Sequence, residues 1–356
     1  MKILYAIQGT GNGHISRAME LIPHLNNYGE VDILVSSSHY ELKLPYHVKY
    51  NLKGLGFVFG KLGGIDLMQT YLQLDTRRFL NEVRSLPVEK YDLILNDFEP
   101  VSAWACRLKN KACIGLSNQN ATLHALAPRP KRVDFIGKTI LEHYAPCSVR
   151  YGFHYTGLDS DVFTPVIRSE IRTLTPTQGQ HICVYLPSYD DRRLILKLQR
   201  FIEEEFIIFS KKSRVSFSEK NVTLKPLDNK LFTEYLSSSA GVITNAGFGT
   251  TSEALFLGKK LLAVPMKGQL EQQCNAAFLA ALGVSIMPSF KRKHIEVIDS
   301  WLKQGLAIQL NYPDKTSELV DLIINRHSGN DNVASNGQSA FDELMENLFN
   351  PGPALS

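Results

Sequence analysis

The 356-residue sequence lacks any apolar run that approaches the ~18 residues a membrane-spanning helix needs. Its first residues, Met1 to Ile7, lead straight into a strand-like segment with one lysine, so we expect no signal peptide. The five cysteines are scattered without C-x-x-C spacing, and their odd number favours reduced thiols in a cytoplasm. The net charge of +4 is too diffuse to indicate nucleic acid. We therefore expect a cytoplasmic protein without a nucleic-acid partner.

The composition that remains is that of an ordinary globular protein. Hydrophobic residues make up 44% and charged residues 21%, over a length that favours two domains. Strands and helices alternate through about Tyr155, which indicates an α/β fold, and the Gly- and Pro-containing segment from Gly157 to Val166 resembles an interdomain linker. We predict one domain at 1–160, a second at 161–328, and a flexible segment with a terminal helix at 329–356.

The most informative segment runs from Val242 to Asn275. A short β-branched run that ends near Asn245 predicts a central strand, and a helix should follow from about Thr250. Gly247 and Gly249 would let a phosphate approach the unpaired backbone N–H groups and the positive dipole end of that helix. The segment therefore predicts an anion cradle, and the alternative is a plain βαβ unit with a glycine turn.

Polar side chains near this cradle suit the rest of a sugar nucleotide. Glu253 lies one and a half turns into the predicted helix, too far in to cap it, where its carboxylate could accept the two hydroxyls of a ribose. A polar loop after Pro265 presents further hydrogen-bonding groups, which are Gln269, Glu271, Gln272 and Asn275. Phosphate, ribose and hexose would then line up in one place.

A second glycine-rich turn opens the chain, in K-I-L-Y-A-I-Q-G-T-G-N-G-H. The strand-like run from Ile3 to Ile7 leads into Gly11 and Gly13, which predicts a doubly wound start. The rival is a dinucleotide-binding fold. Here, however, the third glycine comes one position early for G-x-G-x-x-G, and the second strand ends in serines where that fold has an acidic residue. The turn therefore does not favour NAD.

His14 and Asp97 are the candidates for acid-base chemistry. His14 follows the first glycine turn and could remove a proton from an acceptor hydroxyl, because imidazole titrates near neutral pH. Asp97 follows an apolar strand whose carboxyl end should lie at the same sheet edge, so it could orient the base. His14 could instead contact phosphate or cap its helix, and Asp97 could be a helix N-cap.

The two glycine segments carry a family resemblance. The segment from Val242 to Asn275 resembles the donor-nucleotide motif of GT-B glycosyltransferases, roughly H-x-G-x-G-T-x-x-E-A-L, then P, then D-Q-x-x-N-A. It departs at Asn245, where most of those enzymes carry His or Arg, and at Glu271, where Asp is usual. The turn before His14 resembles the G-x-G-G-H loop of the transferase that adds N-acetylglucosamine to the peptidoglycan lipid intermediate, within the group of families 28 and 1. In family 1 an Asp placed like Asp97 partners the base.

The resemblance implies two Rossmann-like doubly wound domains that face a cleft, with a C-terminal helix crossing back. It implies transfer of a hexose from a nucleotide diphosphate, with UDP favoured, to a hydroxyl acceptor. Inversion without metal or cofactor is the favoured mechanism. The implied catalytic residues are His14 and Asp97, and Gly11 and Gly13 form an acceptor or phosphate loop. The implied donor-binding residues are Ser188, Leu227, Asn245, Gly247, Gly249, Thr250, Glu253, Gln269, Glu271 and Gln272.

Several alternatives stay open. A sugar-nucleotide 2-epimerase would release free UDP and an isomerised sugar, and a non-catalytic nucleotide-sugar-binding subunit would need a partner. The acceptor is unknown, with lipid-linked and glycan acceptors both compatible. Two stretches that mix aromatic and basic residues, Tyr46–Tyr71 and Pro128–Lys138, suit peripheral contact with an anionic membrane at its inner face, or mobile loops. Asp159 and Asp161 form a D-x-D that we interpret as turn residues, because they precede a proline in the linker.

Overall fold

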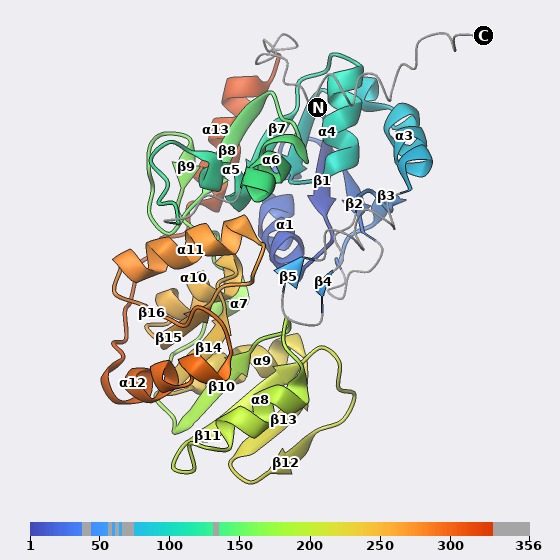
Figure 1. Ribbon diagram of the computed structural model, residues 1–356. Coiled ribbons are helices and arrows are strands. Elements are labelled where there is room, and N and C mark those ends of the chain that lie inside the picture. The colour runs from blue at the N-terminus through green and yellow to red at the C-terminus, as the bar shows by residue number, and fades with distance from the viewer. Residues whose placement is uncertain (38–43, 56–58, 61–63, 66–74, 131–134, 330–356) are drawn as a thin grey trace, which may run out of the picture.

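The computed structural model describes residues 1–37, 44–55, 59–60, 64–65, 75–130 and 135–329. Within these residues two sheets of seven mostly parallel strands form two α/β units, the first above the second in Figure 1. The strand orders are β3-β2-β1-β6-β7-β8-β9 and β12-β13-β11-β10-β14-β15-β16. In each sheet the order reverses beside the unit's first strand, β1 or β10, as in doubly wound folds. The predicted fold class is therefore confirmed.

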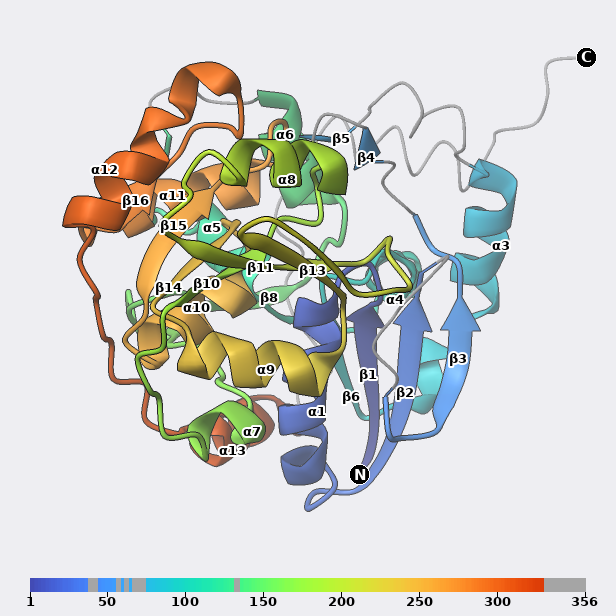
Figure 2. The same ribbon diagram turned by 90° about the horizontal axis from the view of Figure 1, so that it is seen from below.

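The N-terminal sheet forms from short apolar runs that are buried on both faces, as parallel sheets require. Figure 2 shows β1, β2 and β3 side by side. The strands are β1 (Lys2–Gln8), β2 (Glu30–Ser36), β3 (Val48–Leu52), β6 (Leu93–Asp97), β7 (Ile114–Ser117), β8 (Val149–Phe153) and β9 (Val162–Phe163), with a separate hairpin of β4 (Phe59–Gly60) and β5 (Gly64–Ile65). The helices are α1 (Asn12–Leu25), α3 (Thr76–Ser85), α4 (Pro100–Leu108), α5 (Asn118–Leu123) and α6 (Phe135–His143), with a short 3-10 turn at Val88–Lys90.

The C-terminal sheet repeats this plan, except that its edge strand β12 is antiparallel to β13. Its strands are β10 (His181–Tyr185), β11 (Glu205–Ser210), β12 (Phe217–Glu219), β13 (Val222–Pro226), β14 (Gly241–Asn245), β15 (Lys260–Val264) and β16 (Ser285–Ile286). The helices are α7 (Ser169–Arg172), α8 (Asp191–Leu198), α9 (Asn229–Ser238), α10 (Phe248–Phe256), α11 (Leu270–Ala281) and α12 (Glu296–Gln304), with a 3-10 turn at Arg292–His294.

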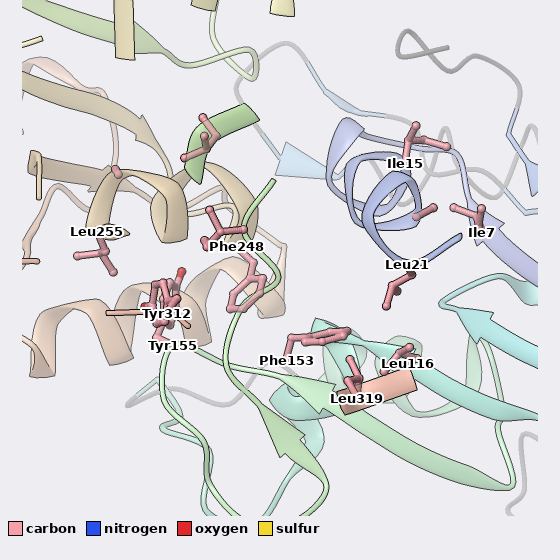
Figure 3. Packing of buried hydrophobic residues seen from close by; sticks show 14 of the residues in the cluster. Ile7, Ile15, Leu21, Leu116, Phe153, Tyr155, Phe248, Leu255, Tyr312 and Leu319 are labelled. Carbon is pink, nitrogen blue, oxygen red and sulfur yellow. The ribbon is translucent and has the colours of Figure 1, made fainter. Parts of the chain in front are cut away.

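Two elements shift the predicted domain boundaries at 160 and 328. Strand β9 pairs with β8, so the N-terminal sheet continues past residue 160. Helix α13 (Thr316–His327) returns to the N-terminal unit and packs on α1, and in Figure 3 its Leu319 lies beside Leu116 and Phe153. The chain thus crosses back through α13, because the apolar face of this helix is buried on the first unit. The terminal helix predicted within 329–356 lies outside the described residues, apart from residue 329.

An aromatic junction joins the two units. Tyr155, just after β8, stacks on Phe278 of α11 with 5.4 Å between ring centroids, and it lies 5.1 Å from the ring of Phe248 in α10. Its hydroxyl forms a 2.7 Å hydrogen bond with Thr251. Figure 3 shows Tyr155 beside Phe248 and Tyr312. This buried junction fixes the two units against each other beside the cleft.

The two stretches that suit contact with a membrane lie partly outside the described residues. Of the stretch 46–71, the structure describes residues 46–55, 59–60 and 64–65, and in the stretch 128–138 residues 131–134 lie outside the description. No helix in the described ranges has the length and apolar character needed to cross a bilayer.

Candidate active site

A cleft of ≈ 1330 Å³ lies between the two units and takes residues from both walls. It covers the carboxyl ends of the strands at both points of reversed strand order, beside β1 and beside β10, where doubly wound folds bind ligands. A typical pocket for one small molecule has a volume of roughly 300–1,000 Å³. The cleft is therefore larger than a typical pocket for one small molecule.

The predicted base and its partner meet on the N-terminal wall. Nδ1 of His14, in the first turn of α1, lies 2.7 Å from Oδ1 of Asp97, the last residue of β6. Arg17, one turn further along α1, donates from Nε to Oδ2 of Asp97 at 2.9 Å and from Nη2 to Oδ1 at 2.5 Å. Sequence reasoning missed Arg17, although its spacing of three residues from His14 on a helix could have revealed it.

The capping alternatives for these two residues are wrong. The N-cap of α4 is Glu99, whose carboxylate accepts hydrogen bonds from the backbone N–H groups of Val101 and Ser102. The N-cap of α1 is Gly11, and His14 lies inside the helix with its ring on Asp97. Asp97 therefore has the geometry of a residue that orients the imidazole.

The electrostatics of this wall favour a charged Asp97. Burial alone raises the pKa of Asp97, but the charge of Arg17 and the hydrogen bonds from Arg17 and His14 outweigh it and hold the pKa below its ordinary value. Because Asp97 is then a carboxylate at neutral pH, Nδ1 of His14 is the donor and Nε2 carries the lone pair of the neutral ring. Gly11 and Gly13 line the cleft beside it, and a Cβ on Gly13 would meet nothing within 4 Å.

The C-terminal wall carries the glycine turn and helix start for which the sequence predicts an anion cradle. Helix α10 begins at Phe248, two residues before the expected Thr250, so Gly249 and Thr250 lie in its first turn. Its N-cap is Gly247, and among the described residues no side chain caps the first-turn N–H groups. A Cβ on Gly249 would meet nothing within 4 Å. Open space before unpaired N–H groups at a helix N-terminus suits a phosphate.

Glu253 is held by an arginine that sequence reasoning missed. Nε of Arg168 donates to Oε1 of Glu253 at 2.6 Å, and Nη2 donates to Oε2 at 2.9 Å. Burial lowers the pKa of Arg168, but the negative charge of Glu253 outweighs it, so the net shift is upward. Each carboxylate oxygen keeps a second lone pair that can accept a ribose hydroxyl. No local pattern marks Arg168, because it lies 85 positions from its partner.

Three predicted donor residues have structural partners already. Asn245 donates from Nδ2 to the carbonyl of Val264 at 2.9 Å and accepts from Oγ of Ser188 at 2.9 Å. The backbone N–H of Leu227 donates to the carbonyl of Ser210 at 2.8 Å, so only its carbonyl could contact a nucleobase. Asn245 and Ser188 thus brace each other and the strand ends behind the cradle.

The polar loop predicted after Pro265 is wrong for three of its four residues, because α11 begins at Leu270 and contains Glu271, Gln272 and Asn275, with Gln269 as its N-cap. The polar side chains were expected in a loop, but the apolar residues between them are buried and favour a helix. Oε1 of Gln272 accepts from the N–H of Met266 at 3.1 Å, and Nδ2 of Asn275 donates to the carbonyl of Ala246 at 3.0 Å. These contacts hold the first turns of α11 against the strand ends and the turn before α10. In contrast, Oε1 of Gln269 is buried and has no hydrogen-bond partner within the described residues. Gln269 lines the cleft.

Glu271 reaches across the cleft to the N-terminal unit. Its Oε1 accepts from Nδ2 of Asn118 at 2.7 Å, and its Oε2 accepts from Nε2 of Gln119 at 2.9 Å. Burial raises the pKa of Glu271 above its ordinary value. Sequence reasoning missed both amides, although they directly follow β7 and the sheet-edge argument that located Asp97 applies to them equally.

The D-x-D residues lie in a turn, as predicted. Oδ1 of Asp159 accepts from the N–H of Asp161 at 2.8 Å, and its Oδ2 lies 2.6 Å from Nε2 of His124. Asp161 accepts from Nη1 of Arg326 at 3.0 Å. The two carboxylates therefore stabilise the turn and its contacts with His124 and Arg326.

The paired doubly wound units and the cleft between them are the architecture of the GT-B glycosyltransferases. A model of glycosyl transferase family 1 matches residues 1–304, and the chain belongs to that family. The predicted family resemblance is thus confirmed, and the protein is a glycosyltransferase.

Known proteins similar to this chain are consistent with this family assignment. An uncharacterised glycosyltransferase of Methanosarcina mazei is 25% identical, with 90% of this chain and 93% of the relative covered. Among solved structures, MurG of Acinetobacter baumannii has a TM-score of 0.56 at 16% identity, covering 91% of this chain and 99% of that one. MnaA of S. aureus, in a co-structure with UDP, has a TM-score of 0.60 at 12% identity, covering 95% and 100%. At these identities the solved structures show the fold.

Proposed function

We propose that this glycosyltransferase moves a hexose from a UDP-linked sugar to a hydroxyl acceptor, with inversion at the anomeric carbon and without a metal ion. The observation that carries the proposal is the 2.7 Å contact between His14 and Asp97 on one wall of a cleft whose other wall holds the open N-terminus of α10. A single displacement needs a base for the acceptor and stabilisation of the leaving diphosphate. The two walls supply one part each.

In the proposed reaction, Nε2 of His14 takes the proton of the acceptor hydroxyl. The acceptor oxygen attacks the anomeric carbon while the bond to the diphosphate breaks on the opposite face, so the configuration inverts. Asp97 stabilises the imidazolium that forms. The first-turn N–H groups at Gly249 and Thr250, with the helix dipole, stabilise the negative charge that develops on the diphosphate. These amides do the work that a metal ion does in other phosphate sites.

Two observations support UDP as the nucleotide. The MnaA co-structure contains UDP, and UGT2 of Phytolacca americana was solved with UDP-2fluoro-glucose and pterostilbene. In this chain the carbonyl of Leu227 can accept from the N3–H of uracil, and Glu253 can receive the ribose hydroxyls. The acceptor is a hydroxyl compound, lipid-linked or glycan. A lipid-linked acceptor would place the enzyme at the inner face of the membrane.

Ligand-induced thermal stabilisation across a panel of nucleotide diphosphates and their sugars tests the donor site, because a ligand of the native state raises the unfolding midpoint. We expect a shift with UDP or one UDP-sugar that disappears in Glu253→Gln. Glutamine is preferred to alanine because alanine would leave the buried guanidinium of Arg168 without its hydrogen-bonded partner.

The outcomes separate the function classes. No shift with any nucleotide in a folded protein would contradict the donor site. A shift accompanied by free UDP and an isomerised sugar would identify a 2-epimerase. Binding without turnover on any acceptor would identify a subunit that needs a partner.

A further inference from the structure

Gln119, in the first turn of α5, touches both halves of the site at once. Its Nε2 donates to Oε2 of Glu271 at 2.9 Å and lies 3.4 Å from Nε2 of His14. The side chain is buried, and its carbonyl Oε1 has no hydrogen-bond partner among the described residues. Next to it, Asn118 donates to the other oxygen of Glu271 at 2.7 Å. Two amides of the N-terminal unit therefore hold one carboxylate of the C-terminal unit.

The contact with His14 falls on the nitrogen that the proposed reaction uses. Because Nδ1 donates to Asp97, the lone pair of the neutral imidazole is on Nε2. The side-chain nitrogen of Gln119 lies 3.4 Å from Nε2 of His14 and so faces this lone pair. An acceptor hydroxyl must lie within hydrogen-bond reach of the same atom to lose its proton. The base and the acceptor therefore meet only after Gln119 has moved.

Glu271 is the stronger of the two contacts that hold Gln119. The hydrogen bond to its carboxylate is charge-assisted and short, whereas the contact with His14 is long for a hydrogen bond. Glu271 lies in the first turn of α11, two residues after Gln269, whose buried Oε1 is also unpaired within the described chain. A sugar hydroxyl that binds at the start of α11 competes with the Gln119 amide for Glu271.

We propose that Gln119 is a positioning residue that covers the base until the donor sugar engages Glu271. The inference rests on the proposed function, because it takes the hexose of the donor as the competing ligand. Donor hydroxyls replace the amide on Glu271, the Gln119 side chain turns away, and Nε2 of His14 becomes accessible. Substrate binding is then ordered, with the donor first and the acceptor second.

Carbethoxylation by diethyl pyrocarbonate tests the cover directly, because the reagent attacks an unprotonated imidazole nitrogen. Peptide mass spectrometry follows the rate at His14, with the exposed His47 as internal reference. We expect Gln119→Ala to raise the rate at His14 by about 2- to 10-fold, the fold-change that one hydrogen bond is worth. Gln273→Ala, a glutamine substitution on α11 outside these contacts, should leave it unchanged. An unchanged rate in Gln119→Ala overturns the proposal.

The donor arm tests the uncovering step. A bound donor limits the access of the reagent to His14 equally in both proteins. In the wild type alone it also moves the Gln119 side chain away from His14. The ratio of the wild-type rate to the Gln119→Ala rate should therefore approach one at saturating UDP-sugar. A ratio that donor leaves unchanged overturns the proposal while the proposed function stands. A protein that no sugar nucleotide stabilises overturns the proposed function and the donor step together. Gln119→Ser, which lacks the amide that contacts Glu271 and His14, should also expose His14 and replaces the alanine variant if that variant fails to fold.

Discussion

The two walls of the cleft each contain a glycine turn that precedes a helix, but the glycines of the two turns have different conformations. Helices α1 and α10 each follow a central strand and a glycine turn, and in both no described side chain caps the N-terminus. Gly11 has a φ of 95°, a left-handed conformation that favours glycine, whereas Gly247 has the ordinary values of −73° and 135°. At Gly249 the protein itself leaves the space of a Cβ empty. Gly11 thus serves the backbone, whereas Gly249, like Gly13, has ordinary backbone and open space at the position of a Cβ.

The buried carboxylates of the two walls, Asp97 and Glu253, differ in their hydrogen-bond partners. Asp97 is shared between Arg17 and His14, so the ion pair also orients an imidazole. Glu253 takes both its short hydrogen bonds from one arginine, Arg168, and keeps its remaining lone pairs for the cleft. Under the proposed function, one buried ion pair supports chemistry on the N-terminal wall and the other supports donor binding on the C-terminal wall. Variants of each wall should separate turnover from donor affinity.

Asp97→Asn should have the largest effect, on the N-terminal wall. The amide can present an N–H to His14 and so favours the wrong tautomer, in which Nε2 no longer accepts a proton. We expect turnover to fall by about 10²–10⁴-fold, the usual contribution of a general base. Donor affinity should stay near that of the wild type, because the cradle is untouched. Steady-state rates and donor titration on a variant with native circular dichroism provide the measurement, and wild-type turnover would remove Asp97 from the mechanism.

Gly249→Val should break the C-terminal wall. A Cβ at this position meets no protein atom, so the fold should persist, but the side chain would enter the space before the first-turn N–H groups. Loss of charge-assisted hydrogen bonds to the diphosphate should weaken donor binding by about 100-fold or more. Calorimetric titration with UDP-sugar measures this, with Gly249→Ala as a smaller graded substitution. Donor affinity equal to that of the wild type would show that no phosphate binds at α10.

The walls were not equally predictable from the sequence. The glycine turn before α10, Glu253 and the polar residues of α11 lie in one contiguous segment, where local patterns located them although they did not show that α11 begins at Leu270. The position of Asp97 followed from the rule that parallel strands end at one edge. Arg168 and Gln119 were missed because their carboxylate partners lie 85 and 152 positions away. Those pairings depend on the path of the linker and on how the units dock. Helix α13 was assigned to the C-terminal unit because an apolar stripe does not say which sheet it covers.

A pH titration should probe the contact between the units. His154 packs edge to face on Phe278 with 4.4 Å between ring centroids, and burial lowers the pKa of His154 to about 4, against the opposing effect of a hydrogen bond with the Thr156 backbone. The unfolded chain binds this proton near pH 6.5. The stability from a neutral His154 is therefore complete above about pH 6.5 and is lost as the pH falls toward 4, by up to about 1.4 kcal/mol per pH unit.

The variant His154→Phe keeps the ring contact and removes this titration. Urea unfolding of both proteins at pH 7, 6 and 5 gives the free energies of unfolding. We expect the wild type to lose on the order of 2 kcal/mol relative to the variant between pH 7 and 5. Titration of the other histidines, including His327, cancels in the difference. Parallel pH profiles would show that His154 is protonated equally in the folded and unfolded chain.

The variants Gly11→Ala and Gly13→Ala should have the smallest effects on stability. They compare a glycine that the backbone requires with a glycine that leaves space in the cleft. Gly11→Ala forces a side chain into a left-handed conformation and should destabilise the protein by about 1 kcal/mol. Gly13→Ala lies in a helical turn with open space for its Cβ and should stabilise the protein by about 0.5 kcal/mol. Opposite signs in urea unfolding would show that one glycine of this turn serves the backbone while its neighbour keeps the cleft open, as Gly249 does. Equal destabilisation would mean that the fold requires both glycines. Gly13 and Gly249 would then share a sequence pattern but not a role in keeping the cleft open.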